Sequence, residues 1–174
     1  VQATRQAAPG AGTVHLDPDT AMNPHTLNAA LRAAGAAVMG VDLVLSGKFS
    51  SSFAAVRPPG HHACRARPMG FCIFNNVAVA ARHALHRHGL ERVAIVDFDV
   101  HHGNGSQDIF WSDKSVMYCS THPMPLFPVT RAVGVYETVQ GDTIDFEILP
   151  GGQFLLCSDG LHAYLNDQRI IDNL

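Results

Sequence analysis

Hydrophobic residues follow two alternating patterns along the chain: long stretches with helical spacing and short continuous runs. Residues 23–46 are dominated by Ala, Leu and Val, with Asn23 as a cap, a proline at the first helical position and Gly47 after the end. This pattern predicts one long, mostly buried helix. Residues 75–88 repeat apolar side chains at helical spacing and end at Gly89, which predicts a second helix.

The short apolar runs predict strands. Residues 92–98 (RVAIVDF) form a continuous β-branched run, as expected for a strand buried on both faces of a parallel sheet. The run at 53–56 stops at two consecutive prolines and predicts a strand that enters a rigid turn. The remaining expected elements are a short helix over 106–111, a strand over 115–120 and an irregular lead-in over 1–14.

The order of these elements predicts an α/β fold in which a parallel sheet is layered with helices. In such sheets the functional groups gather beyond the carboxyl ends of the strands. Two pairs of adjacent histidines follow predicted strands, one at positions 61–62 and the other at 101–102. The fold is therefore expected to bring the two pairs toward one site.

Composition narrows the class of protein. The 174 residues suit about one domain, and 47% hydrophobic and 16% charged residues are ordinary for a globular protein. A net charge of −3 gives no electrostatic argument for nucleic acid or an anionic membrane. Asp42 interrupts the best apolar run, so no membrane span is expected. Four scattered cysteines without a C-x-x-C pair argue against a disulfide scaffold and predict a reducing, cytoplasmic location.

The segment DFDVHHGNG, which begins at Asp97, carries candidate metal ligands. Asp99 and His101 are two positions apart, so in an extended segment their side chains point to the same side. A carboxylate and an imidazole placed in this way form two-thirds of a catalytic zinc site. Asp97 is in phase with them and suits a carboxylate that orients a histidine or binds a monovalent cation. The alternative is that these acids only cap the following turn.

Pro-Pro-Gly precedes His61 and His62 and fixes the backbone before the two rings. Two imidazoles near a metal can divide the roles of general base and of electrostatic or acid partner. The alternative is a surface loop with two solvated histidines. A Gly-Phe step at 70–71 can place an aromatic wall at a narrow pocket, although most buried Phe residues belong only to the core.

Four segments together closely resemble the zinc-dependent histone deacetylase family: RPPGHHA, PMGFCIFNNVAVAA, VAIVDFDVHHGNGSQ and YCSTHPMPLFP. The resemblance runs from about residue 16 to residue 128. It is nearer to class II and to the bacterial acetylpolyamine or acetoin-utilisation type than to class I, notably at Asn104. It implies an arginase-deacetylase fold, here incomplete, the cofactors Zn²⁺ and K⁺, and hydrolysis of an N-acetyl amide such as acetyl-lysine or an acetylpolyamine.

The resemblance also implies roles for individual residues. Asp99 and His101 match zinc ligands. His61 and His62 match the paired catalytic histidines, and Asp97 matches the carboxylate behind the first of them. Gly70, Phe71 and Phe127 match the wall of the acyl tunnel. Asp17 matches the acid that tethers the substrate backbone. The residues that match the potassium site, mostly through backbone oxygens, are Asp97, Asp99, His101, Ser120 and Thr121.

After residue 128 the resemblance changes. The segments with the family's third zinc ligand, an aspartate, and its oxyanion-stabilising tyrosine are not matched. Residues 129–174 instead resemble a late segment of PPM-type metal-dependent Ser/Thr phosphatases, in which Asp159 of the CSDGL segment would bind metal. We therefore expect a partial deacetylase-like domain over 1–128 and a phosphatase-like fragment over 129–174, joined as a chimera or truncation.

The expected function is a zinc-dependent deacetylase whose turnover is impaired, because the third zinc ligand and the tyrosine are unmatched. The alternatives are a non-catalytic acyl-binding or interaction fragment and a fragment of a metal-dependent phosphatase. The apolar runs at 144–149 and 153–158 are expected to pair as a hairpin that shields a sheet edge. We also expect marginal stability and self-association.

Overall fold

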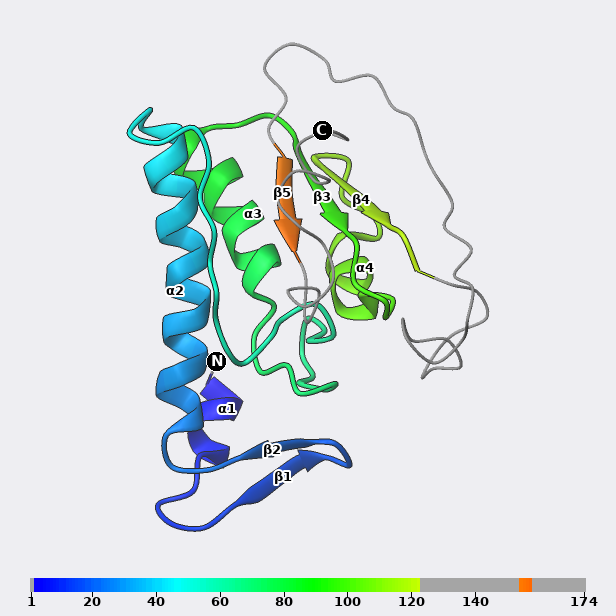
Figure 1. Cartoon of the computed structure of the whole chain (residues 1–174). Helices are drawn as coiled ribbons and strands as arrows, with labels where there is room; N and C mark the ends of the chain where they lie inside the picture. The colour runs from blue at the N-terminus through cyan, green and yellow to red at the C-terminus, as the bar shows by residue number, and fades with distance from the viewer. Residues whose placement is uncertain (1, 123–153, 158–174) are drawn as a thin grey trace, which may run out of the picture.

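The computed structural model describes residues 2–122 and 154–157 (Figure 1). In chain order the elements are α1 (Gln2–Ala7), β1 (Val14–Asp17), β2 (Thr20–Met22), α2 (Thr26–Leu45), α3 (Asn76–His88), β3 (Val93–Asp97), α4 (Asn104–Phe110), β4 (Val116–Ser120) and β5 (Phe154–Cys157). β1 and β2 form an antiparallel hairpin, and the other three strands form a second sheet. The predicted α/β class is confirmed.

β3 is the central strand of the three-stranded sheet, with β4 on one side and β5 on the other, both parallel to it. Its last residue, Asp97, lies opposite Ser120 of β4 and Cys157 of β5. The carboxyl ends of all three strands therefore meet at one edge. The expectation that the run at 153–158 covers a sheet edge is met by β5, whereas its proposed hairpin partner at 144–149 lies outside the described residues.

Apolar side chains from α3, α4, β3 and β4 form the larger core. Val93 and Ile95 are two positions apart and so lie on the same face of β3. They belong to one core cluster with Val77 and Ala81 of α3 and Phe110 of α4. α3 lies between α2 and the sheet (Figure 1). This layering fixes the end of β3 relative to the loop that precedes α3, and so positions the site.

The long predicted helix is present, but it starts later and is less buried than expected. α2 begins at Thr26, and Asn23 instead organises the preceding turn by accepting hydrogen bonds from His25 N and Thr26 Oγ1. Its buried residues are Ala30, Ala33, Ala34 and Gly40. Ala-rich composition satisfies helix propensity on every face, so it does not reveal which face is covered.

α2 also qualifies, by length and composition alone, as a helix that could cross a membrane, with 22% of its apolar window buried. The expectation that Asp42 makes this stretch too polar to span a membrane is therefore wrong, because the helix meets the length and hydropathy criterion with Asp42 included. A core helix of a soluble protein meets the same criterion, and α2 packs along α3.

Two sequence predictions are corrected. Residues 53–56 are not a strand, and Phe53 is 72% exposed. A four-residue apolar run with a single β-branched residue carries no periodicity that distinguishes a strand from a loop. The lead-in expected to be irregular over 1–14 contains the short helix α1, favoured by its alanines and glutamines. Cys64 and Cys119 are free thiols.

Candidate active site

The candidate site lies beyond the carboxyl end of β3, where the loop before α3 meets the loop that follows β3. The ring centroids of His62 and His101, from these two loops, are 5.9 Å apart. The predicted convergence of the histidine pairs is thus confirmed. The two histidines at 101–102 point to different partners, because the His102 ring contacts Gln107 Oε1 of α4.

A buried hydrogen-bonded pair orients the first histidine of the loop before α3. His61 Nδ1 lies 2.8 Å from Asp97 Oδ2, and both side chains are 1% exposed. Tyr118 of β4 donates its hydroxyl to the same carboxylate oxygen at 3.0 Å. Burial, together with the negative charge of Asp97, raises the pKa of Tyr118, so this hydroxyl stays a donor. Since a carboxylate accepts hydrogen bonds, the Nδ1 atom of His61 is the donor in this pair.

The second histidine has a different partner. His62 Nδ1 lies 2.7 Å from Oδ1 of Asn104, the first residue of α4. The amide nitrogen of Asn104 points to sulfur atoms of Met69 (3.4 Å) and Cys64 (3.7 Å), which leaves Oδ1 toward His62. His62 Nδ1 therefore donates to Asn104, so proton exchange by this ring would involve its Nε2.

Asp99 and His101 lie side by side, as their spacing predicts. Asp99 Oδ2 is 3.1 Å from His101 Nδ1 and accepts the His101 backbone N–H at 2.7 Å. Tetrahedral zinc with ligands at 2.0–2.1 Å separates neighbouring ligand atoms by about 3.3 Å. The carboxylate and imidazole thus fit two zinc positions. In residues 2–122 and 154–157, the one group of three potential ligand side chains lies elsewhere, on α2 and α3.

Asn75 ties the histidine loop to two helices, a role that the sequence did not reveal. Its Oδ1 accepts the Ala78 N–H and caps α3, while its Nδ2 donates to Ala63 O at 3.2 Å and to Ser106 Oγ at 3.1 Å. The Ser106 N–H donates in turn to His61 O at 3.0 Å. Asn75 is 6% exposed and Ser106 is fully buried, so these bonds are shielded from water.

The Gly-Phe step lies against the second histidine. A Cβ on Gly70, whose φ is +58°, would overlap the His62 ring, so only glycine fits this close approach. Phe71 follows with φ +63° and is 62% exposed. The β1–β2 hairpin supports this backbone, because Asp19 Oδ1 accepts the Gly70 N–H and Thr20 Oγ1 accepts the Phe71 N–H. The role of Phe71 in an acyl tunnel stays a prediction.

Asp17 is the last residue of β1, directly before the turn of that hairpin. Its Oδ1 accepts the N–H groups of Asp19 and Thr20, at 3.0 and 3.1 Å. Hydrogen bonding with Asp19, and to a lesser degree with Thr20, lowers the pKa of Asp17. The carboxylate is thus partly engaged in shaping the turn, and its predicted contact with a substrate backbone is untested.

The other predicted ligands fall at the end of β4 or outside the described residues. Thr121 N donates to Asp97 O at 2.9 Å, and Ser120 Oγ lies 2.8 Å from His122 Nδ1. Asp97, Ser120 and Thr121, three of the residues predicted for potassium, thus lie at one strand edge, and the potassium site itself stays a prediction. Phe127 and Asp159 lie outside the described residues.

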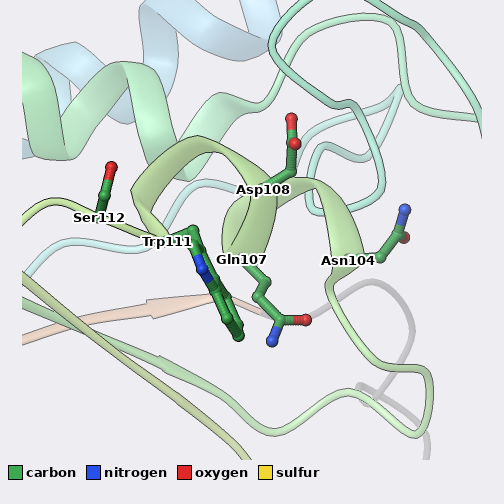
Figure 2. Close-up of a pocket in the computed structure, with 5 residues that line it drawn as sticks. All are labelled: Asn104, Gln107, Asp108, Trp111 and Ser112. Atoms are coloured by element: carbon green, nitrogen blue, oxygen red, sulfur yellow. The ribbon is translucent and has the colours of Figure 1, made fainter.

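An open pocket runs along α4 next to the site (Figure 2). The residues that line it are Asn104, Gln107, Asp108, Trp111 and Ser112. Asn104 therefore borders this pocket and also holds His62. Trp111 is 78% exposed and leaves one side of the pocket apolar.

Comparison with known proteins identifies the family. A family model described as a histone deacetylase domain matches residues 1–159. The matched range continues past residue 128, the predicted end of the deacetylase-like part. The phosphatase resemblance over 129–174 and the boundary at 128 stay predictions.

Relatives and a solved structure share the same region. An uncharacterized protein of Synechocystis sp. is 46% identical over 138 residues, covering 79% of this chain and 44% of the relative. The polyamine deacetylase HDAC10 of Rattus norvegicus is 57% identical over 100 residues, covering 58% of this chain and 17% of that protein. The crystal structure of the HDA15 HD domain aligns with a TM-score of 0.62 and 46% identity, over 63% of this chain and 32% of that one. The chain thus spans less than half the length of each.

Proposed function

Because the chain belongs to the histone deacetylase family and has its arginase-deacetylase fold, we propose that its site hydrolyses N-acetyl amides with the help of zinc. The observation that carries this proposal is the pairing of His61 with Asp97 and of His62 with Asn104. Both rings are held by Nδ1, at a site where Asp99 and His101 offer two metal ligands. A surface loop with solvated histidines would show neither the burial nor these partners.

The two histidines have different roles in this proposal. The Asp97 carboxylate favours a positive charge on the His61 ring, so His61 stabilises negative charge that develops on the acetamide oxygen. The Asn104 amide holds the His62 ring by its Nδ1. In this proposal His62 Nε2 accepts a proton from the attacking water and passes it to the leaving amine.

Zinc is proposed to be held by Asp99, His101 and a further ligand. The chemistry that a bound Zn²⁺ supplies is Lewis-acid polarisation of the acetamide carbonyl and a lower pKa for water. Two protein ligands hold zinc more weakly than the three of ordinary catalytic sites. We infer that the 174-residue chain on its own binds zinc weakly and turns over slowly.

Acetylated amines are the proposed substrates, either acetyl-lysine or an acetylated polyamine. The name of the rat relative, a polyamine deacetylase, supports a polyamine, and the family name supports acetyl-lysine. Phe71 is exposed and follows Gly70, the residue that contacts His62, so it is proposed to provide an apolar surface for the stem that both substrate types share.

The test is a deacetylation assay on the 174-residue chain with added Zn²⁺, using an acetyl-lysine peptide and an acetylated polyamine. We expect turnover close to the detection limit and its complete loss in His61→Ala and in Asp99→Ala. His86→Ala, an exposed histidine on α3, is the matched control and should leave turnover unchanged. Hydrolysis that survives His61→Ala would place the activity at another site, and hydrolysis abolished by Asp159→Ala would make the C-terminal segment part of it.

A further inference from the structure

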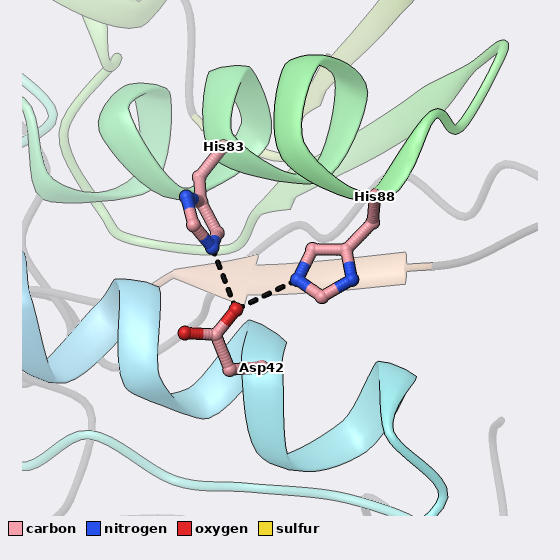
Figure 3. Close-up of side chains that lie close together, drawn as sticks. All are labelled: Asp42, His83 and His88. Carbon is pink, nitrogen blue, oxygen red and sulfur yellow. Dashed lines mark hydrogen bonds and ion pairs between the residues drawn. The ribbon is translucent and has the colours of Figure 1, made fainter.

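A second group of metal-ligand side chains lies between α2 and α3, separate from the candidate active site (Figure 3). Asp42 of α2 points toward His83 and His88 of α3, and both Nε2 atoms approach the same carboxylate oxygen. The distances from Asp42 Oδ1 are 2.6 Å to His83 and 2.7 Å to His88. The two rings meet edge to face, with centroids 5.3 Å apart.

The three donor atoms lie close enough to share one ion, since all are within 4.8 Å of one another. A tetrahedral ion with ligands at 2.0–2.1 Å would separate them by about 3.3 Å. The present nitrogen–oxygen distances would thus open by roughly 0.6 Å, which small rotations of exposed side chains achieve. Such an ion would leave a fourth position for water.

The surroundings restrain the side chains while leaving them accessible. The side chains of His83 and His88 are 23% and 25% exposed, and that of Asp42 is 50% exposed. Val41 and Leu85, their neighbours on α2 and α3, pack against the main core. Hydrogen bonds from His83 and His88 lower the pKa of Asp42, which keeps the carboxylate ionised at neutral pH.

We propose that Asp42, His83 and His88 form a binding site for a divalent transition-metal ion that joins α2 to α3. Two imidazoles and one carboxylate suit Zn²⁺, Ni²⁺ or Cu²⁺, whereas Mg²⁺ and Ca²⁺ prefer oxygen ligands. The ion would exchange with solvent and act as a structural clamp, because the site is open and lies between two packed helices. This inference does not depend on deacetylase activity.

The experiment measures Zn²⁺ binding in the full chain with Asp99→Ala in the background, which removes a ligand of the candidate catalytic site. We expect one Zn²⁺ per chain and a melting temperature raised by about 5 °C when Zn²⁺ is in large excess. His88→Gln and Asp42→Asn should each weaken binding by about tenfold or more. His86→Gln, on the same helix but outside the group, should bind Zn²⁺ like the background chain.

Asp42→Asn is informative because its Oδ1 still accepts both imidazole hydrogen bonds, so the helices stay joined in the absence of metal. A melt in chelator that matches the background chain shows that this variant folds. Equal Zn²⁺ affinity in this variant and the background would overturn the proposal. In that case the three side chains would form only a surface ion pair that contributes little to the free energy of unfolding.

A second measurement uses the unaltered chain and needs no variant. Added Zn²⁺ should shift the ring ¹⁵N resonances of His83 and His88 and leave those of His86 in place. Ring signals of His83 and His88 that do not respond to Zn²⁺ would contradict the proposal, even if the chain takes up zinc elsewhere.

Discussion

The backbone approaches the two candidate catalytic histidines so closely that glycine is required at two positions, 70 and 103. A Cβ on Gly103 would overlap Asp97 Oδ2 and the Tyr118 hydroxyl, and would come within 3.0 Å of His61 Nδ1. A Cβ on Gly70 would overlap the His62 ring. Beside each histidine the backbone leaves no room for even one additional methyl group. A side chain at either glycine would therefore displace the neighbouring ring.

Gly70→Ala tests the close approach of the backbone to His62. We expect loss of the residual deacetylase activity and a stability loss above 2 kcal/mol, because a left-handed Ala costs about 1–2 kcal/mol and the clash with His62 adds to it. Gly89→Ala is the matched control, since Gly89 has a similar φ of +71° with no atom within 4 Å of its Cβ position. Urea unfolding of both variants measures the difference, and equal losses would show that His62 simply moves aside.

Tyr118→Phe removes the hydroxyl that donates to Asp97. We expect a stability loss of about 1–3 kcal/mol at neutral pH, since the buried carboxylate loses a donor. The pKa of Tyr118 is raised by folding, so as pH rises past about 10 the unfolded chain loses this proton first. Stability should therefore fall above that pH in the unaltered chain and fall less in Tyr118→Phe. Parallel pH curves for the two chains would contradict the assignment.

The site residues that the sequence predicted are those whose relation is local. Asp99 and His101 are two positions apart on an extended segment, so alternation alone puts their side chains together. Asn104 and Tyr118 escaped this reasoning as partners, since they reach His62 and Asp97 across 42 and 21 positions. Such contacts arise only when the sheet and loops pack, and no short pattern encodes them.

At the scale of elements, α3 connects the histidine loop to the core. Asn75 caps this helix and anchors the loop at Ala63 through the same amide. Ser106 of α4 holds the loop from the other side. The start of α3 and the start of α4 are therefore coupled through the segment that presents His61.

Substitutions at Asn75 separate the cap from the anchor. Asn75→Ala should lose about 2–4 kcal/mol of stability, because a helix cap contributes about 1 kcal/mol and a buried carbonyl left without a donor costs about 1–3 kcal/mol. Asn75→Ser keeps a cap but is too short to reach Ala63, so it should be about 1 kcal/mol less damaging. In both variants the Ser106 amide should exchange hydrogen faster. Unchanged exchange in both would show that the loop is held without Asn75.

α3 was predicted well, because its periodic apolar stretch is followed by Gly89, whose left-handed backbone ends the helix. The predicted range of 75–88 agrees with the observed Asn76–His88 to within one residue. Residues 53–56 offered only four apolar positions, and they form no strand. The β1–β2 hairpin was missed because Asp17 and Thr20 enclose a turn with no glycine to mark it.

For the whole molecule, exposed apolar side chains and a low net charge favour association. Trp111, Phe53 and Phe71 are 78%, 72% and 62% exposed, and the net charge is only −3. We expect the isolated chain to form reversible oligomers, detected by sedimentation velocity on serial dilution, and Trp111→Gln to shift them toward monomer. A monomer at every concentration that melts above about 65 °C would contradict this expectation.

The position of β5 beside β3 also sets an order of folding. Asp97 lies opposite Ser120 after 23 positions of chain but opposite Cys157 only after 60. Closing the longer loop costs about 0.9 kcal/mol more chain entropy, before any gain from the pairing is realised. The β3–α4–β4 unit should therefore form first and β5 should join later. In pulsed hydrogen exchange during refolding, amides of β4 would be protected before those of β5, and one edge of the growing sheet would stay open in the interval.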